Sequence, residues 1–161
     1  MSESRQGKLY DHQTNSNVNL YFASYDDIDE LCKVINWAYR GKPSISNPEQ
    51  LYSGWVTEQH LIKGARIVPE ELKKLIDDEQ SSVILVAKLK TNDEEKIVGC
   101  WKINLHEPRP NMTDEEKNDR AVEFGLNAVD PDYQSRGIGT LLYNAAIVNY
   151  LLLFIFLLSF C

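Results

Sequence analysis

The feature of the sequence that most constrains its fold is a glycine-containing turn between two apolar runs. The turn spans Asp130–Thr140 and contains Gly137 and Gly139. The run before it, Ala121–Val129, alternates like a β-strand, and the run after it has the apolar character of a buried helix. Glycine lets a backbone turn sharply and approach a ligand closely, and the first N–H groups of a helix have no partner inside it. This layout predicts a phosphate-binding loop.

Size and composition narrow the class of protein. A chain of 161 residues has the length of one domain, and a net charge of −7 argues against nucleic acid as a partner. The three cysteines, Cys32, Cys100 and Cys161, are far apart and fit a reducing compartment. The polar leader 1–17 is expected to be disordered and has no apolar signal sequence, so we expect a cytoplasmic protein. The histidines have no metal-ligand spacing, and no metal is expected.

The remaining patterns predict an α+β or α/β fold. Strands are indicated by alternating or continuous apolar runs, and helices by apolar residues spaced three and four apart. Residues 42–68 are predicted to be irregular. The order is β-α-α-β-β-β-α. The predicted elements are a strand from Val18, a helix that follows Ser24 and ends at Gly41, a helix from Pro69, strands Val83–Leu89, Ile97–Leu105 and Ala121–Val129, and a helix from Thr140.

The turn and the order of elements together resemble a known family. The pattern Gln134-x-x-Gly137-x-Gly139, which follows a strand ending in Val-Asp-Pro, is similar to the acetyl-CoA signature of the GNAT N-acetyltransferase superfamily. The resemblance covers roughly residues 18–148, which we take as an incomplete GNAT domain. It implies a mixed sheet with flanking helices. It also implies an enzyme that transfers an acetyl group from acetyl-CoA to an amine of a small molecule or protein, and it leaves the acceptor open.

The resemblance also implies which residues bind the cofactor. Backbone N–H groups of the loop would hold the CoA pyrophosphate, and backbone groups at the end of the preceding strand would bind the pantetheine arm. Gly125 leaves room for close approach or marks a bulge, and Arg136 either adds charge to the loop or is a solvated side chain. The residues so assigned are Leu126, Asn127, Ala128, Val129, Gln134, Ser135, Arg136, Gly137, Ile138, Gly139 and Thr140.

Glu123 is the candidate catalytic base. It lies eleven residues before Gln134 (134 − 123 = 11), the offset that separates the catalytic glutamate from the glycine loop in GNAT histone acetyltransferases. Acetylation of an amine needs a group that accepts a proton, directly or through water. Burial in a cleft would raise the pKa of such a carboxyl toward the working pH. The alternative is an exposed strand glutamate without a catalytic role.

Three other side chains have both a functional and a structural interpretation. An acyl-enzyme route through Cys100 is one interpretation, but a buried structural cysteine is expected, because the family transfers the acetyl group directly. Trp37 and Tyr39 lie in the region that lines the acceptor site in GNAT proteins. Their alternative role is packing in the core.

The end of the chain departs from the family pattern. No charged residue follows Gly137, and the strands that GNAT proteins place after the loop helix are missing, so residues 149–161 are an apolar tail. One interpretation is a truncated or alternatively spliced, catalytically impaired isoform. The other is a membrane-attached CoA-binding or interaction module, since the 21 uncharged residues Leu141–Cys161 (161 − 141 + 1 = 21) are long enough to span a bilayer core. Because Leu141–Ile147 also belong to the predicted helix over the sheet, truncation is favoured.

Overall fold

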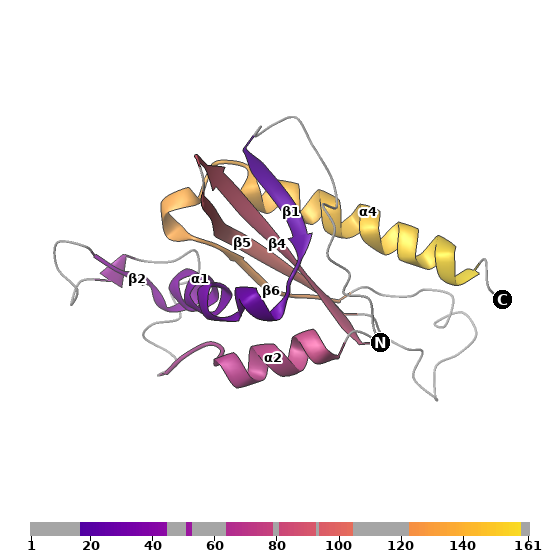
Figure 1. The fold of residues 1–161 in the computed structure, drawn as a ribbon, viewed down its shortest axis with the longest axis horizontal. Coiled ribbons are helices and arrows are strands. Elements are labelled where there is room, and N and C mark those ends of the chain that lie inside the picture. The colour runs from indigo at the N-terminus through magenta and orange to yellow at the C-terminus, as the bar shows by residue number, and fades with distance from the viewer. Residues whose placement is uncertain are drawn as a thin grey trace.

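An antiparallel sheet with helices on both faces forms the described part of the chain (Figure 1). The structure is a computed structural model. It describes the backbone alone for residues 51–52, 123 and 149–158, and the full residues for 17–44, 64–78, 81–92, 94–104 and 124–148. Helices α1 and α2 cover one face of the sheet and α4 covers the other (Figure 1). The predicted fold class is therefore confirmed.

The sheet has four strands in the order β1-β4-β5-β6, and each neighbouring pair is antiparallel. Strand β4 lies inside the sheet, and the first six of its residues are buried, as expected for its apolar, β-branched sequence. Strands β4 and β5 are longer than predicted and meet in a tighter hairpin. The bounds are β1 Val18–Phe22, β4 Ser82–Thr91, β5 Glu94–Asn104 and β6 Glu123–Val129.

A small ribbon corrects the prediction that residues 42–68 are irregular. Strand β2 (Lys42–Pro43) pairs antiparallel with β3 (Leu51–Tyr52). Two-residue strands are too short to give a periodic pattern, which is why the sequence did not reveal them. The ribbon begins directly after α1, and this places Lys42 close to the loop that follows β6.

The helices that follow β1 and precede β4 begin where the sequence predicts. After the turn Tyr25–Asp27, α1 runs over Ile28–Arg40. The Ser24 N–H and Oγ–H both donate to the Asp27 carboxylate, at 2.8 and 2.9 Å. The helix ends at Gly41, whose φ of 93° suits a residue without a side chain. Helix α2, Pro69–Asp77, begins at its proline.

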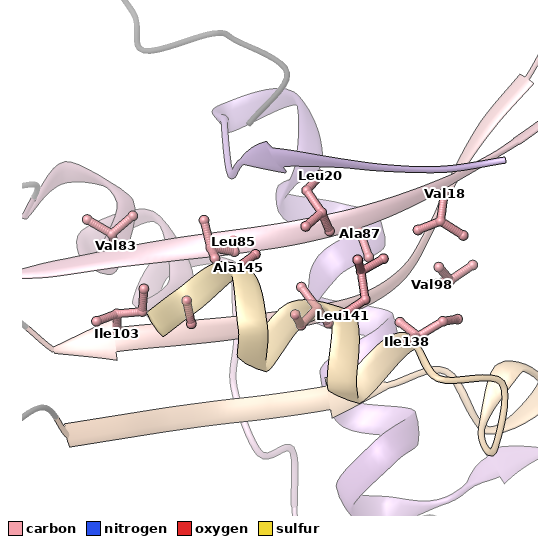
Figure 2. Close-up of a cluster of buried hydrophobic side chains, with 12 residues drawn as sticks. Val18, Leu20, Val83, Leu85, Ala87, Val98, Ile103, Ile138, Leu141 and Ala145 are labelled. Carbon is pink, nitrogen blue, oxygen red and sulfur yellow. The ribbon is translucent and has the colours of Figure 1, made fainter. Parts of the chain in front are cut away.

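Helix α4, Ile138–Leu158, begins two residues before the predicted start at Thr140. It contributes buried side chains to one of the two hydrophobic clusters of the core. Figure 2 shows its apolar side chains directed at those of the strands. Its backbone continues without a break past residue 148. The buried side chains recur at the spacing of one helical face, which is Ile138, Leu141, Leu142, Ala145 and Ala146.

The side chains of the tail 149–161 lie outside the described part of the chain, so both interpretations of the tail stay predictions. No helix among the residues that the structure describes is both long enough and apolar enough to cross a membrane.

Gly99 allows α4 to pack closely on β5. A Cβ atom at this position would lie 2.9 Å from the Ala128 carbonyl oxygen and 3.2 Å from side-chain carbons of Ile138 and Leu142. We therefore expect Gly99→Ala to lower the free energy of unfolding by about 1–3 kcal/mol. Urea denaturation would measure it, with Gly125→Ala as the control, because a Cβ there meets nothing within 4 Å. Equal stability of the two variants would contradict this packing.

Candidate active site

A β-bulge in β6 opens the edge of the sheet where the candidate site lies. Cys100 pairs with Ala128 and Lys102 pairs with Gly125. Two residues of β6, Leu126 and Asn127, therefore stand opposite the single residue Trp101. Leu126 has a φ of 48°, in the left-handed region that non-glycine residues rarely adopt. A bulge bends its strand and interrupts the hydrogen-bond ladder, so backbone groups become available to another molecule.

The bulge also corrects a prediction about the faces of β6. The alternation predicted for Ala121–Val129 implies that Phe124, Leu126 and Ala128 share one face of the sheet, and this is wrong. Phe124 packs in the core under α4, whereas Leu126 and Ala128 pack against the opposite core with α1. The extra residue shifts the alternation by one position. A bulge was one of the two interpretations of Gly125, and it lies at the next two residues, Leu126 and Asn127.

The loop after β6 is shaped by local hydrogen bonds. The Asp130 carboxylate accepts the N–H of Asp132 at 3.1 Å, which begins a short turn over Pro131–Tyr133. Ser135 and Gly137 then have φ values of 60° and 80°. Such left-handed residues turn successive N–H groups into one concave surface that suits an anion.

The N-terminus of α4 completes this surface. The first bond within the helix joins the Leu141 N–H to the Gly137 carbonyl oxygen at 2.9 Å. The N–H groups of Ile138, Gly139 and Thr140 therefore have no partner inside the helix. The helix dipole adds partial positive charge at the same place. This end of α4 is suited to a phosphate group.

A cavity of about 480 Å³ joins the bulge to the helix N-terminus. Its volume is that of a site for a small molecule or cofactor. None of the described residues that line it is an Asp, Glu, Lys or Arg. They are Ala38 and Tyr39 of α1, Cys100 and Trp101 of β5, Asn127, Ala128 and Val129 of β6, Tyr133, Gln134, Ser135 and Gly137 of the loop, and Ile138, Gly139, Thr140 and Tyr143 of α4.

The cavity brings together all the residues assigned to the cofactor from the sequence except Leu126 and Arg136. Leu126 packs against the core cluster that includes α1, and its carbonyl oxygen accepts a hydrogen bond from the Cys100 thiol at 3.2 Å. The guanidinium of Arg136 lies over the ring of Tyr133, 5.1 Å from its centroid. Glu123 begins β6 with its backbone paired to Asn104, and its side chain lies outside the described part of the chain. Its catalytic role therefore stays a prediction.

Cys100 is buried, as the structural interpretation predicted. Burial raises the pKa of its thiol to about 12, although a backbone hydrogen bond opposes the shift. A thiol with this pKa stays protonated near neutral pH and is a poor nucleophile. The geometry therefore gives no support to an acyl-cysteine intermediate.

Several aromatic residues of the cavity wall were not predicted. Tyr39 lines the cavity, as one interpretation expected, but Trp37 instead lies under the ammonium of Lys42, 4.4 Å from its ring centroid. Trp101 and Tyr143 were missed. They meet edge to face at 5.7 Å, and Tyr143 lies one helical turn after Gly139, a spacing that could have indicated it. Trp101 carries no such signal, because only the bulge brings it to the site.

An ion-pair cluster anchors the start of the loop. The carboxylate of Asp130, which is fully buried, accepts hydrogen bonds from the Lys42 ammonium at 2.8 and 3.1 Å. Asp132 accepts another from Lys42 at 2.5 Å, and Lys96 lies 3.5 Å from Asp130. Burial lowers the pKa of Lys42, but its hydrogen bonds to the two aspartates outweigh this and leave the pKa raised. The β2–β3 ribbon is thereby tied to the base of the loop.

We expect Lys42→Met to lower the free energy of unfolding by about 2–3 kcal/mol, because the buried Asp130 carboxylate loses both hydrogen bonds from the ammonium and keeps the longer 3.5 Å contact with Lys96. Lys96→Met should cost less than about 1 kcal/mol, since Lys96 is half-exposed and farther away. Because the folded-state pKa of Lys42 exceeds its ordinary 10.5, its contribution is complete below that pH and is lost as the pH rises through the folded-state value. Thermal unfolding of the parent and both variants at pH 8 to 11 measures the losses of stability and their dependence on pH. Equal losses in the two variants would contradict this account.

The comparisons with known proteins show the family of the chain. The profile of the acetyltransferase (GNAT) family matches residues 47–152, and the chain belongs to that family. The family uses acetyl-CoA as a co-substrate.

A solved structure of an acetyltransferase from Trypanosoma brucei has a similar fold. Its TM-score is 0.50 at 15% identity, over 83% of this chain and 75% of that chain. An identity this low supports the fold alone. No curated protein is significantly similar to the chain in sequence.

Proposed function

We propose that the chain is an acetyl-CoA-dependent N-acetyltransferase that acts on an amine of a small molecule or a protein. The observation that carries this proposal is the cavity that connects the bulge of β6 to the N-terminus of α4, in a chain of the GNAT family. We take residues 18–148 as the catalytic domain.

The two ends of the cavity suit two adjoining parts of the cofactor, the pyrophosphate and the pantetheine arm. Backbone N–H groups of Gln134–Thr140 would bind the pyrophosphate, helped by the dipole of α4. Backbone groups of Asn127–Val129, at the end of β6 where the bulge interrupts the ladder at Leu126 and Asn127, would bind the pantetheine arm. The thioester would then lie near Tyr39 and Trp101, which line the cavity from α1 and β5.

The chemistry we propose is direct transfer to the amine. Acetyl-CoA supplies an activated acetyl group as a thioester. A C–N bond forms between the amine and the acetyl carbon, the C–S bond breaks with its electron pair going to sulfur, CoA leaves as a thiolate that takes a proton from water, and the amine loses one proton. We assign that proton to Glu123, directly or through a water molecule.

Thiol release from acetyl-CoA tests the proposal, with a panel that includes a polyamine, an arylamine, an aminoglycoside, a lysine peptide and peptides with free N-termini. We expect release that depends on one class of amine, together with mass spectrometry that shows the acetylated acceptor. A folded chain that binds CoA but turns over no amine would favour a binding module. A folded chain that does not bind CoA would contradict the assignment of the cavity.

A further inference from the structure

Two aspartates lie at the start of the loop that is assigned to an anion. Asp130 directly follows β6, and Asp132 comes two residues before Gln134, the first residue assigned to the pyrophosphate. Asp130 is fully buried, and Asp132 is more than half-exposed. A carboxylate about 10 Å from a phosphate weakens its binding roughly 2- to 15-fold, depending on how strongly water screens the pair. The loop therefore holds an anion well only if these two charges are cancelled.

The ammonium of Lys42 binds both carboxylates. It donates hydrogen bonds to the two oxygens of Asp130, at 2.8 and 3.1 Å, and to one oxygen of Asp132 at 2.5 Å. An ammonium has three N–H groups, so these two side chains use all of them. Burial alone would lower the pKa of Lys42, but its hydrogen bonds to the aspartates leave the pKa raised. The side chain therefore stays charged near neutral pH.

A second cation completes the charge balance of this cluster. Lys96 of β5 lies 3.5 Å from the Asp130 carboxylate, and its ammonium lies over the ring of Tyr133, 5.0 Å from the centroid. The cluster thus combines two cations, Lys42 and Lys96, with two carboxylates, and its formal charge is zero. Loss of Lys42, which makes the shorter contacts, would leave one uncancelled negative charge at the start of the loop.

Lys42 acts on the cavity from outside it. The cavity is lined by Ala38 and Tyr39 at the end of α1, and β2 begins with Lys42 directly after this helix ends at Gly41. Neither Lys42 nor the two aspartates belong to the described lining. We propose that Lys42 is a positioning residue for the cofactor, whose ammonium cancels the charges of Asp130 and Asp132 so that the loop can hold the pyrophosphate of CoA.

This inference rests on the proposed function and deepens it. Calorimetry with CoA tests it at about 20 mM and about 500 mM salt, because salt screens charges that lie several ångströms apart. At low salt, Lys42→Met should bind CoA about 5- to 20-fold more weakly than the parent does, and the loss should shrink at high salt. Lys42→Arg keeps the positive charge and should stay within about threefold of the parent.

Lys88→Met is the matched control, because it removes another lysine that is paired with a buried aspartate. The Lys88 ammonium lies 2.6 Å from the Asp27 carboxylate, and neither residue belongs to the described lining of the cavity. Both lysine variants should melt at a lower temperature than the parent, since each leaves a buried carboxylate without its close cation. Only Lys42→Met should also lose affinity for CoA.

A second substitution separates charge from structure. Asp132→Asn removes one negative charge and keeps the shape of an exposed side chain. Alone, it should strengthen CoA binding about 2- to 5-fold at low salt. Combined with Lys42→Met, it restores a formal charge of zero and should recover most of the lost affinity. A purely structural role of Lys42 predicts no such recovery, because the double variant still lacks the ammonium that holds Asp130.

The inference is overturned if folded Lys42→Met binds CoA as the parent does, if its loss is the same at both salt concentrations, or if Lys88→Met loses as much affinity. In each case the parent still binds CoA, and the proposed function stands without this role of Lys42. If the parent itself does not bind CoA, the proposed function fails and the inference fails with it. If Lys42→Met does not fold, Asp132→Asn decides alone, and an unchanged affinity overturns the inference.

Discussion

Replacing Gly139 with aspartate is expected to weaken CoA binding roughly 100- to 1,000-fold. Gly139 lies in the first turn of α4 and lines the cavity, and a Cβ atom there would meet nothing within 4 Å. The variant should therefore fold. Its carboxylate would lie beside the site proposed for the pyrophosphate, where repulsion between two charges about 4 Å apart amounts to about 4 kcal/mol near a protein surface. Calorimetric titration with CoA measures the loss.

Two controls separate charge from shape. Gly139→Asn adds a side chain of the same size without charge and should cost less than about tenfold. Gly139→Ala should bind CoA nearly as the parent does, because the space at this position is open. Gly137 is less suitable for this test, because its φ of 80° would strain any other residue. A loss of CoA affinity in a Gly137 variant could then come from impaired folding. Equal affinities for the aspartate and asparagine variants would show that no phosphate lies at this end of α4.

Replacing Glu123 with glutamine is expected to reduce turnover about 100- to 10,000-fold, which is the usual contribution of a general base. The amide keeps the shape of the side chain and cannot accept the proton. CoA affinity should change little, because the assigned pyrophosphate and pantetheine contacts lie elsewhere. The loss should shrink at high pH, where a larger fraction of the amine is already deprotonated. A pH–rate profile measured with the best amine of the panel gives both results.

Glu94→Gln is the matched control for Glu123→Gln, because Glu94 is an exposed strand glutamate at the β4–β5 hairpin. It should have the parent's rate at every pH. A Glu123→Gln variant with the parent's profile would exclude this residue as the base. A variant with equally reduced rates at all pH values would point to a structural role.

The elements with strong local signals were predicted well from the sequence. The Ser24–Asp27 helix start, the helix end at Gly41 and the start of α2 at Pro69 depend on chemistry within a few residues. The loop before α4 was recognisable for the same reason, since its glycines and the apolar helix residues that begin at Ile138 lie in one short stretch. Local rules therefore located one end of the cavity.

The other end depends on contacts between distant parts of the chain. The bulge at Leu126 and Asn127 arises from the register between β5 and β6, and Gly125, one residue earlier, indicates it without fixing its position. The same register brings Trp101 to the cavity. The pairing of Lys42 with Asp130 joins residues 88 positions apart, through a ribbon too short to predict. Pairings of this kind could not be inferred from one sequence.

Hydrogen–deuterium exchange of the backbone amides, with and without CoA, tests most directly that the cavity is a CoA site. The account predicts slower exchange in Gln134–Thr140, whose first helical N–H groups lack partners within α4, and in Leu126–Val129, where the bulge interrupts the ladder. The hairpin between β4 and β5 should be unchanged. CoA binding that protects other segments and leaves these two unchanged would contradict the account.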